Sequence, residues 1–159
     1  GYNAGAEFQF AVFKYFHWAI RGEYLFSSAG PLTLTTGATR RVTLRSFPLT
    51  LGLVFSFPDW KWFRLSIGGY GGVAVGTLLQ VQDKTSTQIG TLSYNSYDPV
   101  FMLAAQGSIG ISRSLGIFFE GAYRYQSAPQ KASASFGLPA VTINYGGVEV
   151  RSGLEFRFH

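Results

Sequence analysis

The 159-residue sequence contains no cysteine, a single methionine and only two histidines. Without cysteine the chain forms no disulfide and offers no thiolate ligand to a metal. Charged residues make up 13% of the chain, about half the usual share of a soluble domain. So few charges would cover a water-facing surface poorly.

Long hydrophobic runs are also missing, since no window approaches the roughly 18 uninterrupted apolar residues of a membrane-spanning helix. Instead, apolar residues recur at every second position, the period of a β-strand. Between Arg64 and Leu79 one face carries Leu65, Ile67, Val73, Val75 and Leu79. The other face carries Arg64, Ser66, Gly68, Gly72, Ala74 and Gly76.

This alternation predicts an all-β chain of seven strands in a single domain, residues 1–159. Several predicted strands exceed the usual five or six residues and reach the 9–11 residues of a strand that crosses a bilayer. The predicted strands are Ala6–Phe13, Phe16–Ser28, Arg41–Phe57, Trp62–Leu79, Pro99–Ser112, Gly116–Gln126 and Val141–Phe158.

The predicted connections alternate in length. Residues 14–15, 58–61 and 113–115 form short turns, whereas residues 29–40, 80–98 and 127–140 form long polar loops rich in Ser, Thr, Gly, Gln and Asn. Short turns at one end and long loops at the other are typical of outer-membrane barrels. We therefore expect an antiparallel up-and-down transmembrane barrel.

The volumes of the two faces indicate which one points outward. The apolar face is too bulky for the inside of a small barrel, whose interior is just filled by side chains at about eight strands. A soluble barrel of lipocalin type, with the apolar face inside, is the alternative. Lysine argues against it, since Lys14, Lys61, Lys84 and Lys131 all fall in predicted turns or loops.

Ten charged residues have the inward parity and predict a neutral lumen crossed by ion pairs. Buried charges must be paired, and arginine pairs with carboxylates better than lysine. The alternative is a water-filled pore lined by rings of charge. The predicted network consists of Glu7, Glu23, Glu120, Glu149 and Glu155 with Arg21, Arg64, Arg124, Arg151 and Arg157.

Two further clusters suggest contacts with the membrane. Amphipathic rings prefer the headgroup boundary, so the aromatic residues near the short turns predict an interfacial girdle; ordinary strand-end aromatics are the alternative. Its members are Tyr15, Trp18, Trp60, Trp62, Phe156 and Phe158. Arg40, Arg41 and Arg45 at the base of the first long loop are candidate contacts for lipopolysaccharide phosphates, or else simply a solvated loop base.

The last predicted strand, from Val148 to Phe158, alternates apolar residues and ends in an aromatic. It resembles the closing strand of bacterial outer-membrane barrels, and the architecture of the chain is most similar to the small OmpA/OmpX-type barrels. The resemblance implies a Gram-negative outer membrane, although His159 after the terminal Phe departs from the pattern. It names no function.

Seven strands do not close a purely antiparallel barrel, because bacterial single-chain barrels have an even number. We expect either one further upstream strand, cleaved in an outer loop or unresolved, or parallel pairing of the first and last strands. The expected partners are the lipid bilayer, lipopolysaccharide and an envelope protein or complementing strand.

Catalytic and cofactor-binding motifs are absent from the sequence. His17 is expected to be structural, and no Ser-His-acid spacing, zinc motif or phosphate loop occurs, so no cofactor or metal is expected. The basic pI of about 9.6 does not imply nucleic acid, because no basic patch interleaves with aromatics. We expect a non-enzymatic anchor, surface-binding protein or assembly subunit; a narrow pore is the alternative and a lipid-modifying enzyme a distant third.

Overall fold

A computed structural model describes residues 1–33, 39–58, 60, 62–84, 89–130, 141–144 and 146–156. It is an all-β structure with eight strands in the order of the chain. They are β1 (Tyr2–Phe13), β2 (Phe16–Thr33), β3 (Thr39–Ser56), β4 (Phe63–Lys84), β5 (Ile89–Gly110), β6 (Leu115–Gln130), β7 (Val141–Asn144) and β8 (Gly147–Phe156).

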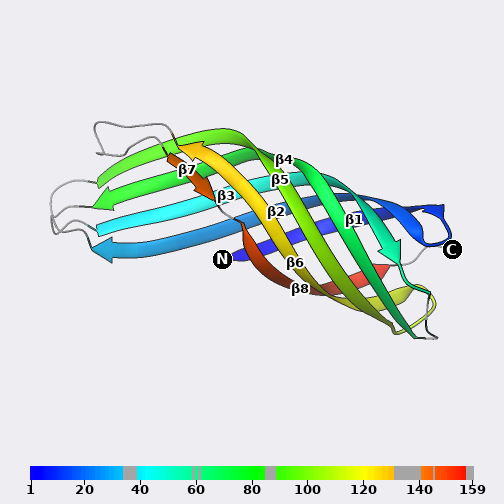
Figure 1. Cartoon of the computed structure of the whole chain (residues 1–159). Helices are drawn as coiled ribbons and strands as arrows, with labels where there is room; N and C mark the ends of the chain where they lie inside the picture. The colour runs from blue at the N-terminus through cyan, green and yellow to red at the C-terminus, as the bar shows by residue number, and fades with distance from the viewer. Residues whose placement is uncertain are drawn as a thin grey trace.

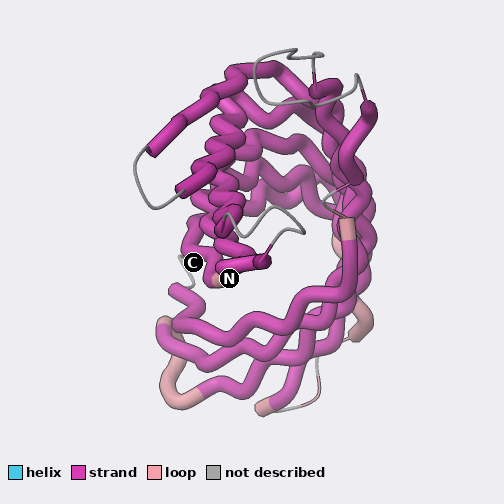
Figure 2. The backbone as a smooth tube through the Cα atoms, turned by 90° about the vertical axis from the view of Figure 1, so that its left-hand side faces the viewer, coloured by secondary structure: helices cyan, strands magenta, loops and turns pink. Residues whose placement is uncertain are grey.

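The sheet is an antiparallel meander in which consecutive strands from β1 to β7 pair with each other (Figure 1). β7 and β8 both pair with β6, β7 along residues 127–130 and β8 along residues 115–124. They are therefore two parts of one long strand. Seven long strands thus form the curled half-barrel, as the sequence predicts (Figure 2).

The strands run further than predicted. β4 continues to Lys84 and β5 begins at Ile89, so most of the long loop predicted over residues 80–98 is a paired hairpin. The prediction for residues 29–40 was wrong in the same way, because β2 ends at Thr33 and β3 begins at Thr39. Backbone hydrogen bonds between neighbouring strands hold these extensions. A prediction based on the alternation of apolar residues does not detect them. Of the third predicted loop, residues 131–140 lie outside the described part of the chain.

β3 shows most clearly which face of the sheet is covered. From Leu44 to Ser56 its even-numbered residues are buried, whereas Leu49, Leu51 and Leu53 on the other face are 51–58% exposed. The apolar face therefore points outward, as predicted. The small and polar face lines the inside of the curl.

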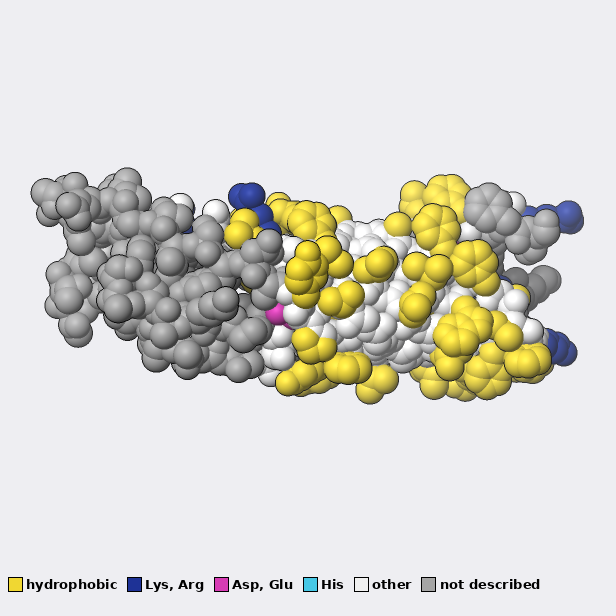
Figure 3. Space-filling model, turned by 90° about the horizontal axis from the view of Figure 1, so that it is seen from above, with side chains coloured by type: hydrophobic (Ala, Val, Ile, Leu, Met, Phe, Trp, Pro, Cys, Tyr) yellow, Lys and Arg dark blue, Asp and Glu magenta, His cyan; other side chains and the backbone are white. Residues whose placement is uncertain are grey.

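Exposed large hydrophobic residues far outnumber buried ones among the described residues, the reverse of a soluble domain. Figure 3 shows the exposed hydrophobic side chains in groups along the described part of the barrel wall. The buried apolar residues are mostly small, and they are Ala19, Leu44, Val54, Tyr70, Ala74, Val100, Met102, Ala104 and Ala122.

β4 contains an irregularity that the sequence pattern did not predict. The register with β5 shifts between Ala74 and Thr77, and Gly76 lies in between with a φ of +69°. Glycine adopts this left-handed conformation without a steric penalty. Strict alternation puts Thr77 outward with Val73 and Val75, but the bulge turns Thr77 inward, where it is 1% exposed.

Candidate functional site: an ion-pair network inside the half-barrel

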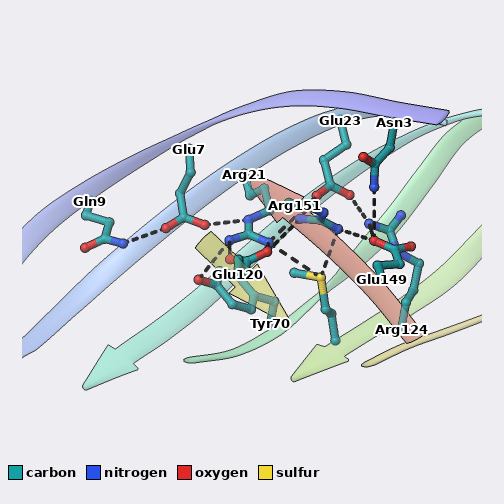
Figure 4. Close-up of polar contacts among 11 residues, drawn as sticks. Asn3, Glu7, Gln9, Arg21, Glu23, Tyr70, Glu120, Arg124, Glu149 and Arg151 are labelled. Carbon is teal, nitrogen blue, oxygen red and sulfur yellow. Dashed lines mark hydrogen bonds and ion pairs between the residues drawn. The ribbon is translucent and has the colours of Figure 1, made fainter. Parts of the chain in front are cut away.

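The inside of the half-barrel is crossed by a connected set of charged side chains (Figure 4). The strand period places them there, because residues two apart on one strand share a face. β1 and β2 contribute Glu7, Arg21 and Glu23, while β6 and β8 contribute Glu120, Arg124, Glu149 and Arg151. The network thus links strands at the two ends of the sheet.

Arg21 is the centre of this network and is 5% exposed. Its Nη1 and Nη2 donate to the two carboxylate oxygens of Glu120, at 2.9 and 2.5 Å, and its Nε donates to Glu7 at 2.5 Å. A guanidinium fork matches a carboxylate in this two-point geometry. Arg21 thereby ties β2 to β1 on one side and to β6 across the lumen.

Arg124 and Arg151 complete the network. Both pair with Glu23 of β2, Arg124 Nε lies 2.9 Å from Glu149, and Arg151 Nη1 lies 3.1 Å from Glu120. Arg151 also pairs with Glu149 on its own strand. Each carboxylate in this part of the lumen therefore has at least one arginine partner.

Tyr70 on β4 supports Arg21. The guanidinium carbon of Arg21 lies 4.4 Å from the centre of the Tyr70 ring, and Arg21 Nη2 is 3.4 Å from the Tyr70 hydroxyl. The ring lies against the backbone of Gly52 and Gly68, and a Cβ at either position would collide with it. Glycine is therefore required there by close approach.

A second polar layer lies beside the network, and the sequence pattern did not single it out. Gln126 Nε2 donates to Ser46 Oγ at 3.0 Å, and Ser46 Oγ lies 3.2 Å from Thr77 Oγ1. Asp98 on β5 is fully buried, and its carboxylate has no hydrogen-bond partner among the described residues. The burial of Ser46 and Gln126 follows from strand parity, but that of Thr77 depends on the bulge at Gly76.

Two of the ten predicted network residues form a separate pair. Arg64 Nη1 lies 3.5 Å from Glu155, with side chains 28% and 20% exposed, whereas seven others join the central network described above. Arg157 lies outside the described residues. Among the described residues the central network therefore has three arginines and four glutamates, an excess of one negative charge if all are ionised.

The predicted arginine cluster is divided between two faces. Arg41 and Arg45 are exposed, and the Arg45 guanidinium lies 6.0 Å from the Phe26 ring. Arg40 has the opposite parity and is half-buried. The structure does not bring the three guanidinium groups together on one surface.

The predicted aromatic girdle is largely exposed at the short-turn end of the sheet. Trp18, Trp60, Trp62 and Phe156 are 51–70% exposed, and Tyr15 is half-buried against Phe55 at 6.3 Å between ring centres. Phe158 lies outside the described residues.

Metal ligation and acid–base catalysis are two other roles that His17 and the acidic side chains could have. No group of three potential metal ligands occurs among the described residues, and none of the described segments is a helix long and apolar enough to cross a membrane. His17 is half-buried in β2, in register with Ala11 and Val54. A chain of paired guanidinium and carboxylate groups fixes strand positions and fills space, whereas general acid–base chemistry requires a group free to exchange a proton with a substrate.

Scans against protein-family models, curated proteins and solved structures return no match.

Proposed function

We propose that this chain is a transmembrane β-barrel of a bacterial outer membrane, with a lumen plugged by its own ion pairs. One observation carries the proposal. The outward face carries most of the exposed large hydrophobic side chains, while the inward face holds charged and polar groups. Large exposed apolar surface marks a membrane or a protein interface, and only helices and closed barrels satisfy their backbones in lipid.

The energetics favour lipid over water on the outer face. Each large apolar side chain is stabilised by about 1.5–3 kcal/mol when it is transferred from water to an apolar environment. Leu51, Leu103 and Val150 are 58%, 69% and 82% exposed, so most of this stabilisation is unrealised in water. The exposed tryptophans at the short-turn end would lie at a headgroup boundary.

The role we propose is non-enzymatic: an anchor, surface-binding protein or assembly subunit, whose specificity resides in the connections opposite the short turns. Arg41 and Arg45 are exposed near that end and remain candidate contacts for lipopolysaccharide phosphate. Replacing both by Gln should reduce the lipopolysaccharide that co-purifies, whereas a matched Arg113→Gln variant at a short turn should not.

The alternative is a narrow pore, and the ion-pair network argues against it. Arg21, Glu120 and Arg124 are 5%, 2% and 1% exposed, and they meet partners from opposite walls. A conducting lumen would leave such side chains hydrated along a continuous path. The plugged barrel should therefore show no stepwise conductance above background in planar bilayers.

Fractionation of Gram-negative cells that express the chain tests the location. We expect the protein in the outer-membrane fraction, with a heat-dependent mobility in denaturing gels, because a folded barrel resists detergent until it is heated. Recovery of folded protein from the aqueous fraction would contradict the proposal, and stable conductance steps would favour the pore.

A further inference from the structure

The half-barrel has two free edges, one along β1 and one along β8. β1 pairs with β2 and β8 pairs with β6, and no pairing joins β1 to β8 among the described residues. The opening is visible between the ends of the ring of strands in Figure 2. An unpaired edge presents a row of backbone donors and acceptors to any strand that can reach it.

The burial pattern shows that the inside of the half-barrel is least covered along these edges. In β3 the inward residues from Leu44 to Ser56 are all buried. In β8 no inward residue is buried, and in β1 even Gln9 and Ala11 on the inward parity are exposed. The two edge strands therefore lack the cover that a neighbouring strand gives to the others.

The ion-pair network shows the same asymmetry. The side chains of Glu7 on β1 and Glu149 on β8 are 15% and 20% exposed, whereas those of Glu23 and Glu120 are 5% and 2% exposed. Asn3 Nδ2 reaches across the opening to Glu149 Oε2 at 3.2 Å. The gap is therefore narrow enough for inward side chains to bridge, while the backbones stay unpaired.

The directions of β1 and β8 limit which kind of strand can fill the gap between them. Six successive antiparallel pairings make β1 and β8 run in the same direction. A single strand that runs the other way pairs antiparallel with both. If a second copy in the same membrane orientation filled the gap, β8 of each copy would lie parallel to β1 of the other. Closure would then require two parallel pairings, which are slightly less stable per residue than antiparallel ones.

We propose that one further strand of the same polypeptide, outside residues 1–159, fills the gap between β1 and β8. We assign it to the same polypeptide because each connection of this meander joins neighbours in sequence. A short connection from the added strand to β1 or β8 would also keep that strand at a high effective concentration next to both edges. The inference rests on the sheet and its burial pattern, and it holds whether or not the outer-membrane proposal is correct.

The edges specify the chemistry of this strand. Its outward residues are apolar, continuing Phe8 and Phe10 on β1 and Val148 and Val150 on β8, which are 56–82% exposed. Its inward residues are small, except for one arginine or lysine at the level of Glu7. That charge balances the extra carboxylate of the central network and lies where its carboxylates are least buried.

Single cysteines provide clean reporters, because the chain has none of its own. Ala11→Cys reports on the β1 edge and Gly147→Cys on the β8 edge, where a Cβ meets nothing within 4 Å. Ala19→Cys, on the inward face of β2 and 0% exposed, is the matched buried control. Labelling by a charged thiol reagent is measured in detergent micelles.

In the 159-residue chain we expect both edge cysteines to react about tenfold or more faster than Ala19→Cys, since uncovered positions react without unfolding. A designed ten-residue strand with one inward arginine, fused ahead of Gly1 through a turn, should slow both edge cysteines toward the control. A scrambled strand should not, and a strand with inward glutamate should protect less. Equal slow labelling at all three positions without any added strand would show that β1 and β8 meet directly and would overturn the inference.

Intact mass spectrometry from native membranes tests the source of the strand. We expect one polypeptide heavier than the 17.4 kDa of these residues. A mass of 17.4 kDa would overturn the assignment to the same polypeptide.

Discussion

Replacement of Arg21 by Met probes the ion-pair network at its centre. The substitution keeps much of the side-chain volume but removes the two contacts to Glu120, the contact to Glu7 and the stacking on Tyr70. Glu120 keeps Arg151 at 3.1 Å, whereas Glu7 keeps the neutral side chains of Gln9, at 2.6 Å, and Tyr70 as hydrogen-bond donors. Glu7 is thus the carboxylate that loses its charge partner.

Removing one partner of a buried ion pair costs about 3–5 kcal/mol, mainly because a charge is left uncompensated. Since the Glu7 side chain is 15% exposed, partial hydration should bring the loss for Arg21→Met toward the lower end of that range. The matched control is Arg64→Met, whose pair with Glu155 spans 3.5 Å between side chains that are 28% and 20% exposed. This longer and less buried pair should contribute less, nearer the about 0–1 kcal/mol of a surface ion pair.

Urea unfolding in detergent micelles, followed by tryptophan fluorescence, measures both free energies of unfolding. Arg21→Met combined with Glu7→Gln should recover part of the loss, since it neutralises the orphaned carboxylate. The reasoning is refuted if Arg21→Met costs no more than Arg64→Met, or if the double variant is less stable than Arg21→Met alone.

Two further pairs of substitutions test the packing inside the wall and the surroundings of its outer face. Gly52→Ala places a methyl group against the Tyr70 ring and should cost about 1–3 kcal/mol. Gly121→Ala, where a Cβ meets nothing within 4 Å, should change stability by less than about 0.5 kcal/mol. Equal costs for the two glycines, measured in the same urea assay, would show that Tyr70 is not held against Gly52. On the outer face, Leu51→Arg should destabilise the barrel in lipid vesicles by about 2–4 kcal/mol at the bilayer midplane, while Leu51→Phe should be nearly neutral. A neutral Leu51→Arg would indicate that this face meets water.

The sequence predicted the all-β meander and the orientation of its faces, because a period of two is a local property of the chain. It did not predict the full length of the hairpins around residues 33–39 and 84–89. Those extensions lack a regular alternation of apolar residues, and they are held by backbone ladders that the sequence pattern does not reveal.

The contacts of the network were only partly accessible from sequence. The alternation along each strand predicts that Arg21 and Glu120 both point inward, but they are separated by 99 residues in the sequence. Whether they meet depends on the register of every strand between β2 and β6. Thr77 shows the limit of parity, because a single bulge at Gly76 reverses the direction of its side chain. The grouping of Arg64 with Glu155, apart from the central network, likewise depends on register.

The most direct test of the account is the environment of each residue along β3. Nitroxide labels at single cysteines from Leu49 to Val54, in protein reconstituted into lipid vesicles, report collisions with oxygen in lipid and with a water-soluble nickel complex. We predict high oxygen and low nickel accessibility at Leu49, Leu51 and Leu53, with low values for both reagents at the buried positions between them. High nickel accessibility at the three leucines would contradict a lipid-facing wall, and high nickel accessibility at the inward positions would contradict a plugged lumen.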